Sequence, residues 1–451
     1  MFVDTGNVQR IVAKQYPWGC ARHIFLHAPT SVAMRALLQE IVQYVCYGDI
    51  GPTQEWAINI SFTYAGLAAL ISPAVLERFE SAFIDGPQAN QLGDAINSPS
   101  SPLNWWEKQF TSDQVHCIVH IHAANDVALL AGTAAVEAAI SNTAIEELIP
   151  RSDGSRLDGR VFERSKLHFG YIDGLSKLEI GWDDGLRRAD QVDFRSFVLG
   201  YHSDEIQSFP MNGDAADLVR DSSYMAFRWI YQDVASFEKY LAFYGPKMFP
   251  EFEHSHAIEL LAAKMMGRWR DGTPLVLSPN SSQPALAGED FTYAGDKMGF
   301  KCPLSAHIRV VNPRDQELMP HAKIQGVPRI LRRGLPYGPP LASPVDDGVD
   351  RGVIGLFLCS NIRRQFITLM QWISRNDFSP DFDSHGAYQD PIMGNRQIPG
   401  CKPEFKIPNP QGDVTTPALP DFLRTKGTLY LMIPSRRTLQ RLVDASDPLA
   451  H

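Results

Sequence analysis

Residues 223–237 are SYMAFRWIYQDVASF, a stretch that joins an apolar run to the start of a helical pattern. The run YMAFRWIY (224–231) predicts a buried strand, and DVASFEKYLAFYG (233–245) predicts a helix that ends at Gly245. The same order of strand and then helix recurs within residues 56–70, in 115–122 with 126–140, and in 353–359 with 361–373. Strands that alternate with helices in this way predict an α+β protein of two halves, with a boundary somewhere in residues 150–195.

The segments between these units carry weaker signals. FVLGY (197–201) resembles a strand, HAIELLAAKMMGRW (256–269) has the periodicity of a helix, and HIRVV (307–311) is short and is expected to be extended. Residues 84–112 and 376–420 are rich in residues that favour turns, so we expect a long loop and a mostly irregular segment there.

Composition excludes several classes of protein. The 451 residues are 44% hydrophobic and 21% charged, which excludes a collagen, a disordered chain and a coiled coil. A net charge of −9 argues against nucleic acid as the main partner. The six cysteines form no CxxC pair, so zinc-ribbon and thioredoxin signatures are absent and reduced thiols are expected. The sequence shows neither a secretory pattern in MFVDTGNVQR nor an apolar run of membrane-spanning length, and we expect a cytoplasmic protein without a membrane partner.

Three histidines on one predicted strand are the first candidate for chemistry. His116, His120 and His122 share one parity, so their side chains are expected on one face. They could converge on a metal ion, but no carboxylate or cysteine lies at a convincing spacing, and a polar strand face is the favoured interpretation.

The stretch HFGYIDGLSK (168–177) is more informative, because Gly170 and Gly174 bracket Asp173. Glycines allow backbone geometry that holds a side chain in a fixed orientation beside a ligand, but on spacing alone an ordinary Asp-Gly turn is the favoured interpretation. Two further candidates are His307, which lies between two proline-marked turns, and the arginine-rich run RILRRGLPYGPP (329–340). Such a run is usually a solvated face, but it can also hold carboxylates or an anionic intermediate.

Six motifs in a fixed order carry a resemblance to a known family. They are GYIDG (170–174), SYMAFRWIYQDVASF (223–237), AAKMMGRWRDGTPLVLSP (262–279), GFKCPLSAHIRVVNPRD (299–315), RILRRGLPYG (329–338) and RGVIGLFLCSNIRRQF (351–366). Together they resemble the dye-decolorizing peroxidase family, whose members bind haem b, iron protoporphyrin IX. The resemblance implies an α+β fold of two ferredoxin-like domains with facing antiparallel sheets, as in the dimeric α+β barrel superfamily. It implies an N-terminal domain over residues 1–185 and a haem-binding domain over residues 186–451.

The resemblance also implies roles for individual residues. His307 is expected to be the proximal ligand of the haem iron, and Asp173 the distal acid and base. Arg332 is expected to be the distal arginine that stabilises charge and contacts a haem propionate. The register of the motif, counted from the Gly-x-Pro-Tyr-Gly stretch that follows, favours Arg332 over Arg333. Arg309 is a further candidate for a propionate contact.

Leu356 and Leu358 are expected to line the distal pocket, because alternate residues of a strand share a face. The chain departs from the family pattern at Lys177 and Leu178, which change only the exit of the GYIDG loop. It also departs at Arg363 and Arg364, where many members carry an acidic residue near the proximal histidine. No partner for His307 Nδ1 is therefore assigned, and three candidates follow in sequence: Asp377, Asp381 and Asp383.

The function implied by the resemblance is a haem peroxidase that reduces hydrogen peroxide and oxidises bulky aromatic donors, such as dyes and phenolics, by one-electron steps. One alternative is a haem-binding or haem-handling protein with little peroxidase turnover. A second is a structural α+β protein that has lost its site. The identity of the donor and the presence of a homo-oligomer stay open at this point.

Overall fold

The structure is a computed structural model in which residues 2–48, 51, 54–94, 98–162, 165–188, 190–204, 206–210, 212–319, 326–376, 378–379, 388–398 and 400–444 are described. Its N-terminal half contains β1 (Cys20–His27), α2 (Ser31–Ile41), β2 (Trp56–Phe62), β3 (Cys117–Ala123), α7 (Asp126–Ser141), β4 (Glu146–Leu148) and β5 (Leu157–Arg160). Its C-terminal half contains β8 (Ser223–Gln232), α9 (Val234–Met248), α10 (His254–Met266), α11 (His307–Val311), β9 (Leu331–Arg332), β10 (Leu335–Tyr337), β11 (Gly352–Cys359), α12 (Thr368–Arg375), β14 (Leu423–Ile433) and α13 (Arg436–Val443).

Shorter elements fill the connections. They are α1 (Arg10–Ala13), α3 (Tyr64–Ala68), α4 (Pro73–Leu76), α5 (Ser81–Asp85), α6 (Ala89–Leu92), α8 (Gly213–Leu218), the strand pairs β6 (Ile180–Gly181) with β7 (Val192–Asp193) and β12 (Lys406–Ile407) with β13 (Val414–Thr415), several 3-10 turns, and a π-helix at Ile362–Ile367. None of the helices in the described ranges is both long and apolar enough to cross a membrane.

The two halves repeat one strand order. In the N-terminal half the order across the sheet is β2-β3-β1-β4, and in the C-terminal half it is β10-β11-β8-β14. If the four strands on each path are numbered along the chain, both orders are 2-3-1-4, which is the order of a ferredoxin-like unit. The halves join edge to edge through β14 and β2, where Met432 pairs with Phe62. The α+β class and the ferredoxin-like repeat predicted from the sequence are therefore confirmed.

The inner faces of the two half-sheets pack against each other. The ring of Phe227 on β8 lies 5.5 Å from that of Phe25 on β1 and 5.4 Å from that of His23. At Gly159 on β5, an added Cβ would come within 2.8 Å of Leu335 Cβ on β10, so the close approach of the two halves at this point requires a glycine. The domain boundary near residue 185 stays a prediction, because this shared core joins the two repeats.

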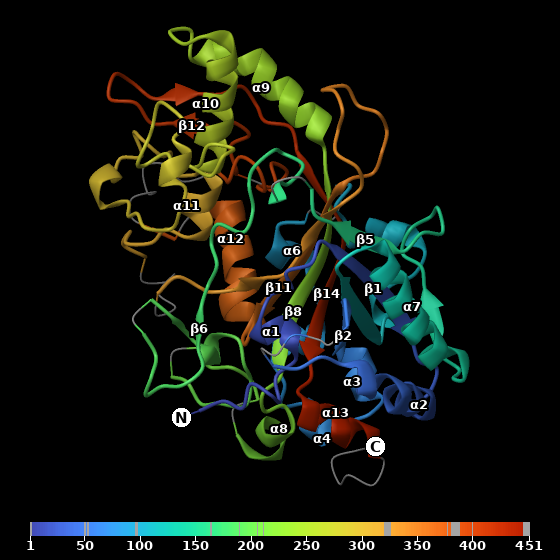
Figure 1. Cartoon of the computed structure of the whole chain (residues 1–451). Helices are drawn as coiled ribbons and strands as arrows, with labels where there is room; N and C mark the ends of the chain where they lie inside the picture. The colour runs from blue at the N-terminus through green and yellow to red at the C-terminus, as the bar shows by residue number, and fades with distance from the viewer. Residues whose placement is uncertain are drawn as a thin grey trace.

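Helices cover the outer faces of the sheet. In Figure 1, α7 and α2 lie beside the strands of the N-terminal half, and α12 lies beside β11. The N-termini of these helices follow ordinary capping rules: Asn125 accepts from Ala128 N at 2.9 Å before α7, and Asp233 accepts from Ser236 N at 2.9 Å before α9. The apolar residues of the outer faces and these helices form one core, and the inner faces form a second.

Local predictions are confirmed for the long elements and are wrong for several short ones. The strands within 56–70, 115–122, 224–231 and 353–359 are present, as are the helices that follow them. FVLGY follows a 3-10 turn at Phe194–Ser196 and is not a strand, and 307–311 is the helix α11. The helix α9 continues past Gly245 to Met248, and residues 84–112 contain α6 and a 3-10 segment at Pro102–Lys108. Runs of about five residues carry too little periodicity to separate these states.

Candidate active site

The GYIDG loop holds Asp173 through its backbone. Gly170 and Gly174 adopt φ values of +85° and +78°, a left-handed region that favours glycine. Asp173 N donates to Ser165 O at 2.9 Å, and the buried Tyr171 hydroxyl donates to Ala262 O of α10 at 2.7 Å. These anchors leave the Asp173 side chain 35% exposed. The loop therefore holds the backbone of Asp173 in place and leaves its carboxylate accessible to solvent.

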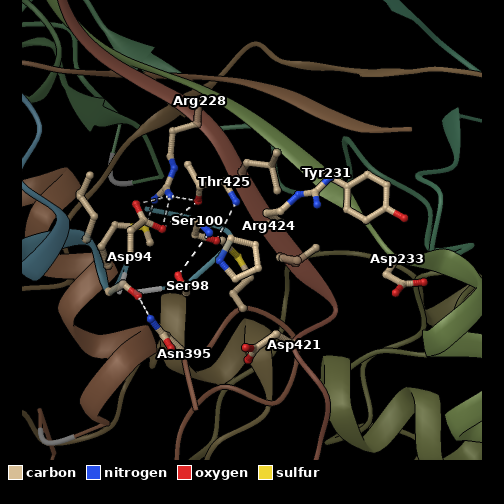
Figure 2. A pocket seen from close by; sticks show the side chains of 18 residues that line it. Asp94, Ser98, Ser100, Arg228, Tyr231, Asp233, Asn395, Asp421, Arg424 and Thr425 are labelled. Atoms are coloured by element: carbon tan, nitrogen blue, oxygen red, sulfur yellow. Dashed lines mark hydrogen bonds and ion pairs between the residues drawn. The ribbon is translucent and has the colours of Figure 1, made fainter. Parts of the chain in front are cut away.

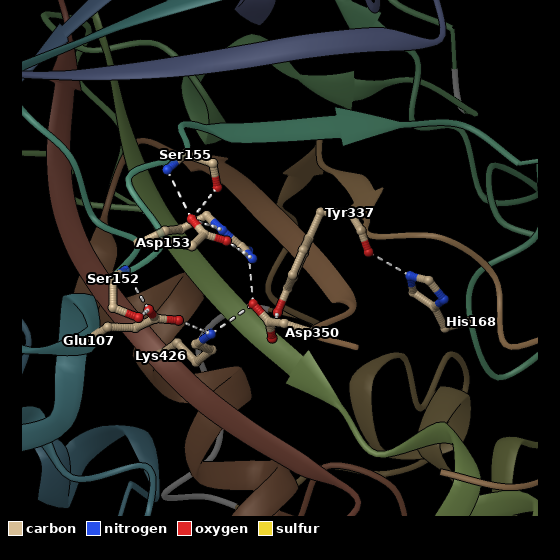
Figure 3. Close-up of polar contacts among 9 residues, drawn as sticks. Glu107, Ser152, Asp153, Ser155, His168, Tyr337, Asp350 and Lys426 are labelled. Carbon is tan, nitrogen blue, oxygen red and sulfur yellow. Dashed lines mark hydrogen bonds and ion pairs between the residues drawn. The ribbon is translucent and has the colours of Figure 1, made fainter. Parts of the chain in front are cut away.

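A second anchor ties this loop to the strand that follows the candidate distal arginine (Figure 3). His168 Nε2 lies 2.7 Å from Tyr337 O on β10, and Tyr337 is buried with its hydroxyl donating to Asp350 Oδ1 at 3.0 Å. Burial lowers the pKa of His168 to about 4, so this imidazole is neutral. The segment that leads into the loop of Asp173 is thus fixed to β10 by a buried hydrogen bond.

The two adjacent arginines of β9 and its exit lie in different environments. Arg332 Nη1 lies 3.3 Å from Asp173 Oδ1, and its side chain is 47% exposed. Arg333 Nε donates to Ile11 O at 3.0 Å, and burial lowers the pKa of Arg333 to about 10. The structure brings Asp173 and Arg332 together, and it places Arg333 on other partners.

The second candidate pair lies on other elements. His307 is the first residue of α11, and its Nδ1 lies 2.6 Å from Asp390 Oδ2. The side chain of Asp390 is fully buried, and its other oxygen accepts from Ile392 N at 2.8 Å and from Met393 N at 2.9 Å. A carboxylate only accepts hydrogen bonds, so Nδ1 carries the imidazole proton and the Nε2 lone pair is left for a metal. This donor set fits an axial histidine ligand of haem iron.

The sequence analysis missed Asp390. The candidates that it named, Asp377, Asp381 and Asp383, lie outside the described residues. A local signal was present, because an aspartate before proline favours a turn in which the carboxylate accepts backbone N–H groups, and Asp390 does this in front of Pro391. Nothing in the sequence links that turn to a histidine 83 positions earlier.

Arg309 does not have the role expected of it. Its side chain is fully buried, and its guanidinium binds Asp296 Oδ2 at 3.0 Å, Cys302 O at 2.6 Å and Gln316 Oε1 at 2.9 Å. It also lies 4.4 Å from the ring centre of Tyr293. Arg309 therefore ties the segment before α11 to Asp296, and it is removed from the candidate propionate contacts.

The expectation that Leu356 and Leu358 line the distal pocket is also corrected, because the register of β11 places their side chains on the other face of the strand. In the pairing of β9 with β11, Arg332 is opposite Phe357 and Leu331 is opposite Leu358. Directly opposed residues project to the same side, so Phe357 shares the face of Arg332. Leu356 and Leu358 project to the other side, into the inner core. The ring of Phe357 folds back over Gly355, where an added Cβ would come within 2.4 Å of it.

The three histidines of β3 do not form a metal site. His116 precedes the strand and accepts from Ala28 N at 3.1 Å, whereas His120 and His122 are buried between the half-sheets. His120 Nδ1 lies 2.9 Å from His23 Nδ1. Across the described ranges, no group of three or more His, Cys, Asp or Glu side chains is placed to hold a metal ion. The face is polar, as favoured from the sequence, but it is buried.

Comparisons with known proteins find similar sequences and similar folds. The chain is 28% identical over 414 residues to a dye-decolorizing peroxidase of Mycena epipterygia, covering 84% of this chain and 74% of the relative. It is 30% identical over 301 residues to the multifunctional dye peroxidase of Amycolatopsis sp., covering 61% and 60%. The crystal structure of a dye-decolorizing-type peroxidase from Auricularia auricula-judae superposes with a TM-score of 0.80 at 24% identity, covering 98% of this chain and all of the other.

No family model matches the sequence. The fold likeness extends to an ancestral D-type dye-decolorizing peroxidase, with a TM-score of 0.79 at 22% identity. The curated relatives share 25–28% identity over most of the chain, and their names agree with one another. Together these comparisons show that the chain is similar in sequence to the dye-decolorizing peroxidases and shares the α+β fold of their solved structures.

Proposed function

We propose that the chain is a haem-dependent peroxidase that reduces hydrogen peroxide and oxidises aromatic donors by one-electron steps. The observation that carries the proposal is the contact of 3.3 Å between Arg332 and Asp173, both of which keep accessible side chains. A proton acceptor beside a fixed positive charge is what heterolysis of a peroxide requires. The relatives named as dye-decolorizing peroxidases support the same activity.

The proposed mechanism uses two pairs of residues, His307 with Asp390 and Asp173 with Arg332. When bound, haem b supplies the iron at which the peroxide O–O bond breaks. His307 would hold this group through Nε2, and Asp390 fixes the proton on Nδ1 and orients the ring. Asp173 accepts the proton of the inner peroxide oxygen on its carboxylate and returns it to the outer oxygen. Arg332 stabilises the negative charge that develops on the departing oxygen and remains the candidate for a propionate contact.

The donor is proposed to be an aromatic compound such as a dye or a phenol. One solved structure with this fold is a dye-decolorizing peroxidase in complex with 2,6-dimethoxyphenol, at a TM-score of 0.78 and 23% identity. The alternative of a haem-handling protein rests on the basic residue Arg363, where many family members carry an acidic residue, and on a possible role in iron metabolism. The contact between His307 and Asp390 supplies an acidic partner for that histidine and therefore favours the peroxidase.

Haemin reconstitution tests the proposal. The full chain is titrated with haemin, the Soret band is followed, and oxidation of 2,6-dimethoxyphenol by hydrogen peroxide is then measured. We expect a stoichiometric complex, peroxide-dependent turnover, and loss of haem from His307→Ala. A suitable control is Asp190→Asn, because the exposed Asp190 pairs with Arg188 at 3.1 Å on the surface, and this variant should behave as the unmodified chain. Failure to bind haemin would refute the proposal, and haem binding without turnover would favour the haem-handling alternative.

A further inference from the structure

A cavity of about 200 Å³ opens between β8, β14, α12 and the segment that follows Asp390 (Figure 2). Apolar side chains make up much of its lining: Leu92, Ile230, Met370, Met393 and Leu423. Cavities for drug-sized ligands have volumes of roughly 300–1,000 Å³. This cavity is smaller, so it suits a ligand with one ring and excludes a polycyclic dye.

One end of the cavity is a buried ion pair. Arg228 Nη2 lies 2.9 Å from Asp94 Oδ2, and their side chains are only 3% and 7% exposed. Thr425 Oγ1 donates to Asp94 Oδ1 at 2.8 Å, and Figure 2 shows the three side chains gathered at one end. Burial raises the pKa of Asp94 in spite of Arg228. At this end, the carboxylate of Asp94 can accept a hydrogen bond from the hydroxyl group of a ligand.

The other end of the cavity is open and slightly acidic. The Arg424 guanidinium lies 4.7 Å from the ring centre of Tyr231, and two carboxylates, Asp233 and Asp421, lie on the same rim. The charges of Arg228 and Asp94 compensate each other, so the rim carries two negative charges against one positive charge. This balance disfavours an anionic ligand such as a benzoate or a sulfonated dye, and it admits a neutral one.

The cavity is connected to His307 through two residues, Met393 and Asp390. Met393 contributes its side chain to the cavity wall, and its backbone N–H donates to Asp390 Oδ1 at 2.9 Å. The other oxygen of Asp390 contacts His307 Nδ1 at 2.6 Å. From size, lining, charge and this connection, we infer that the cavity is a binding site for a neutral single-ring phenol, with the hydroxyl directed at Asp94. The inference rests on the proposed function only for the identification of this phenol with the electron donor.

Calorimetric titration of the full chain with 2-methoxyphenol tests the site without relying on turnover. The unmodified chain should bind 2-methoxyphenol at least about fivefold more tightly than 1,2-dimethoxybenzene, which has the same ring but no hydroxyl to donate. Benzoate should not bind. Equal affinity for 2-methoxyphenol and 1,2-dimethoxybenzene, or tighter binding of benzoate, would overturn the inference. Neither outcome depends on a variant that could misfold.

The second measurement is the affinity of a variant in which a larger side chain fills the cavity. Leu423→Trp places a larger ring in the wall, and binding of 2-methoxyphenol should weaken at least about tenfold. The matched control is Leu277→Trp, because Leu277 is 45% exposed and outside the cavity lining, and its affinity should be unchanged. An unchanged affinity in Leu423→Trp would place the ligand elsewhere.

Haemin titration of the same preparations separates the two ideas. If haemin binds but 2-methoxyphenol does not, only the phenol site is refuted. If haemin does not bind, the proposed peroxidase function fails, and the calorimetric result still decides the phenol site.

Discussion

Asp390→Asn is the sharpest test of the proximal pair, because it changes one atom type and almost no volume. In the structure, Asp390 Oδ2 faces His307 Nδ1 at 2.6 Å, while Oδ1 accepts from Ile392 N and Met393 N at 2.8 and 2.9 Å. The two backbone donors require an oxygen at Oδ1, so the new amide nitrogen must face His307. That nitrogen donates, so Nδ1 must accept, and the imidazole proton moves to Nε2. The atom expected to bind the iron then carries a proton.

The magnitude follows from the interaction that is lost. A hydrogen bond to a charged group contributes about 1.5–3 kcal/mol, and each 1.4 kcal/mol corresponds to about a factor of ten in affinity. Haemin should therefore bind Asp390→Asn about 10–100-fold more weakly, as measured by absorbance titration. Asp204→Asn is the matched control, because Asp204 lies 3.0 Å from His202 on the surface with both side chains exposed. Wild-type affinity in Asp390→Asn would refute the role of this pair.

Three further predictions concern the distal pair and the buried histidines. Asp173→Asn should slow the reaction with peroxide about 10²–10⁴-fold in stopped-flow absorbance while haem stays bound. Arg332→Leu should slow it about 10²–10³-fold, and wild-type rates in either variant would reassign the residue. Burial lowers the pKa of His23 and His122 to about 3 and that of His120 well below its usual range. The unfolded chain therefore binds more protons below pH 6.5, so stability is lost as the pH falls from 6.5 towards 3, by about 1.4 kcal/mol per histidine per pH unit. Urea unfolding at pH 6.5 and 5.5 measures this slope, and a slope that His122→Phe leaves unchanged would contradict the assignment.

The long elements could be predicted because their signals are local. The strand β8 and the helix α9 follow from consecutive residues, and the spacing of glycines around Asp173 marks a loop whose φ values the structure reports as positive. Arg332 was predicted to be the distal arginine by counting along one motif, and the structure places its guanidinium beside Asp173, although its role stays a prediction. None of these inferences depended on knowing which distant segments of the chain contact these residues.

The errors and the omission at the candidate site share one physical cause, which is dependence on a distant segment. The strand β11 is mostly buried on both faces, so periodicity alone could not tell which parity faces Arg332. That parity is set by its pairing with the two-residue strand β9. The role of Arg309 depends on Asp296, and the role of Asp390 depends on a turn that brings it to His307. These contacts form only in the folded chain, and a single sequence does not report them.

The difference in burial between the two pairs indicates why they can do different work. A carboxylate that gives and takes protons must be reached by the reacting molecule, and Asp173 is 35% exposed beside Arg332, which is 47% exposed. A carboxylate that fixes a tautomer must instead exclude competing donors such as water. Asp390 is fully buried, and backbone N–H groups occupy its second oxygen, so His307 has no solvent competitor there. Burying the first pair would prevent the proton exchange with peroxide that we propose for it. Exposing the second pair would weaken the control that Asp390 is proposed to have over His307, because a surface ion pair contributes only about 0–1 kcal/mol.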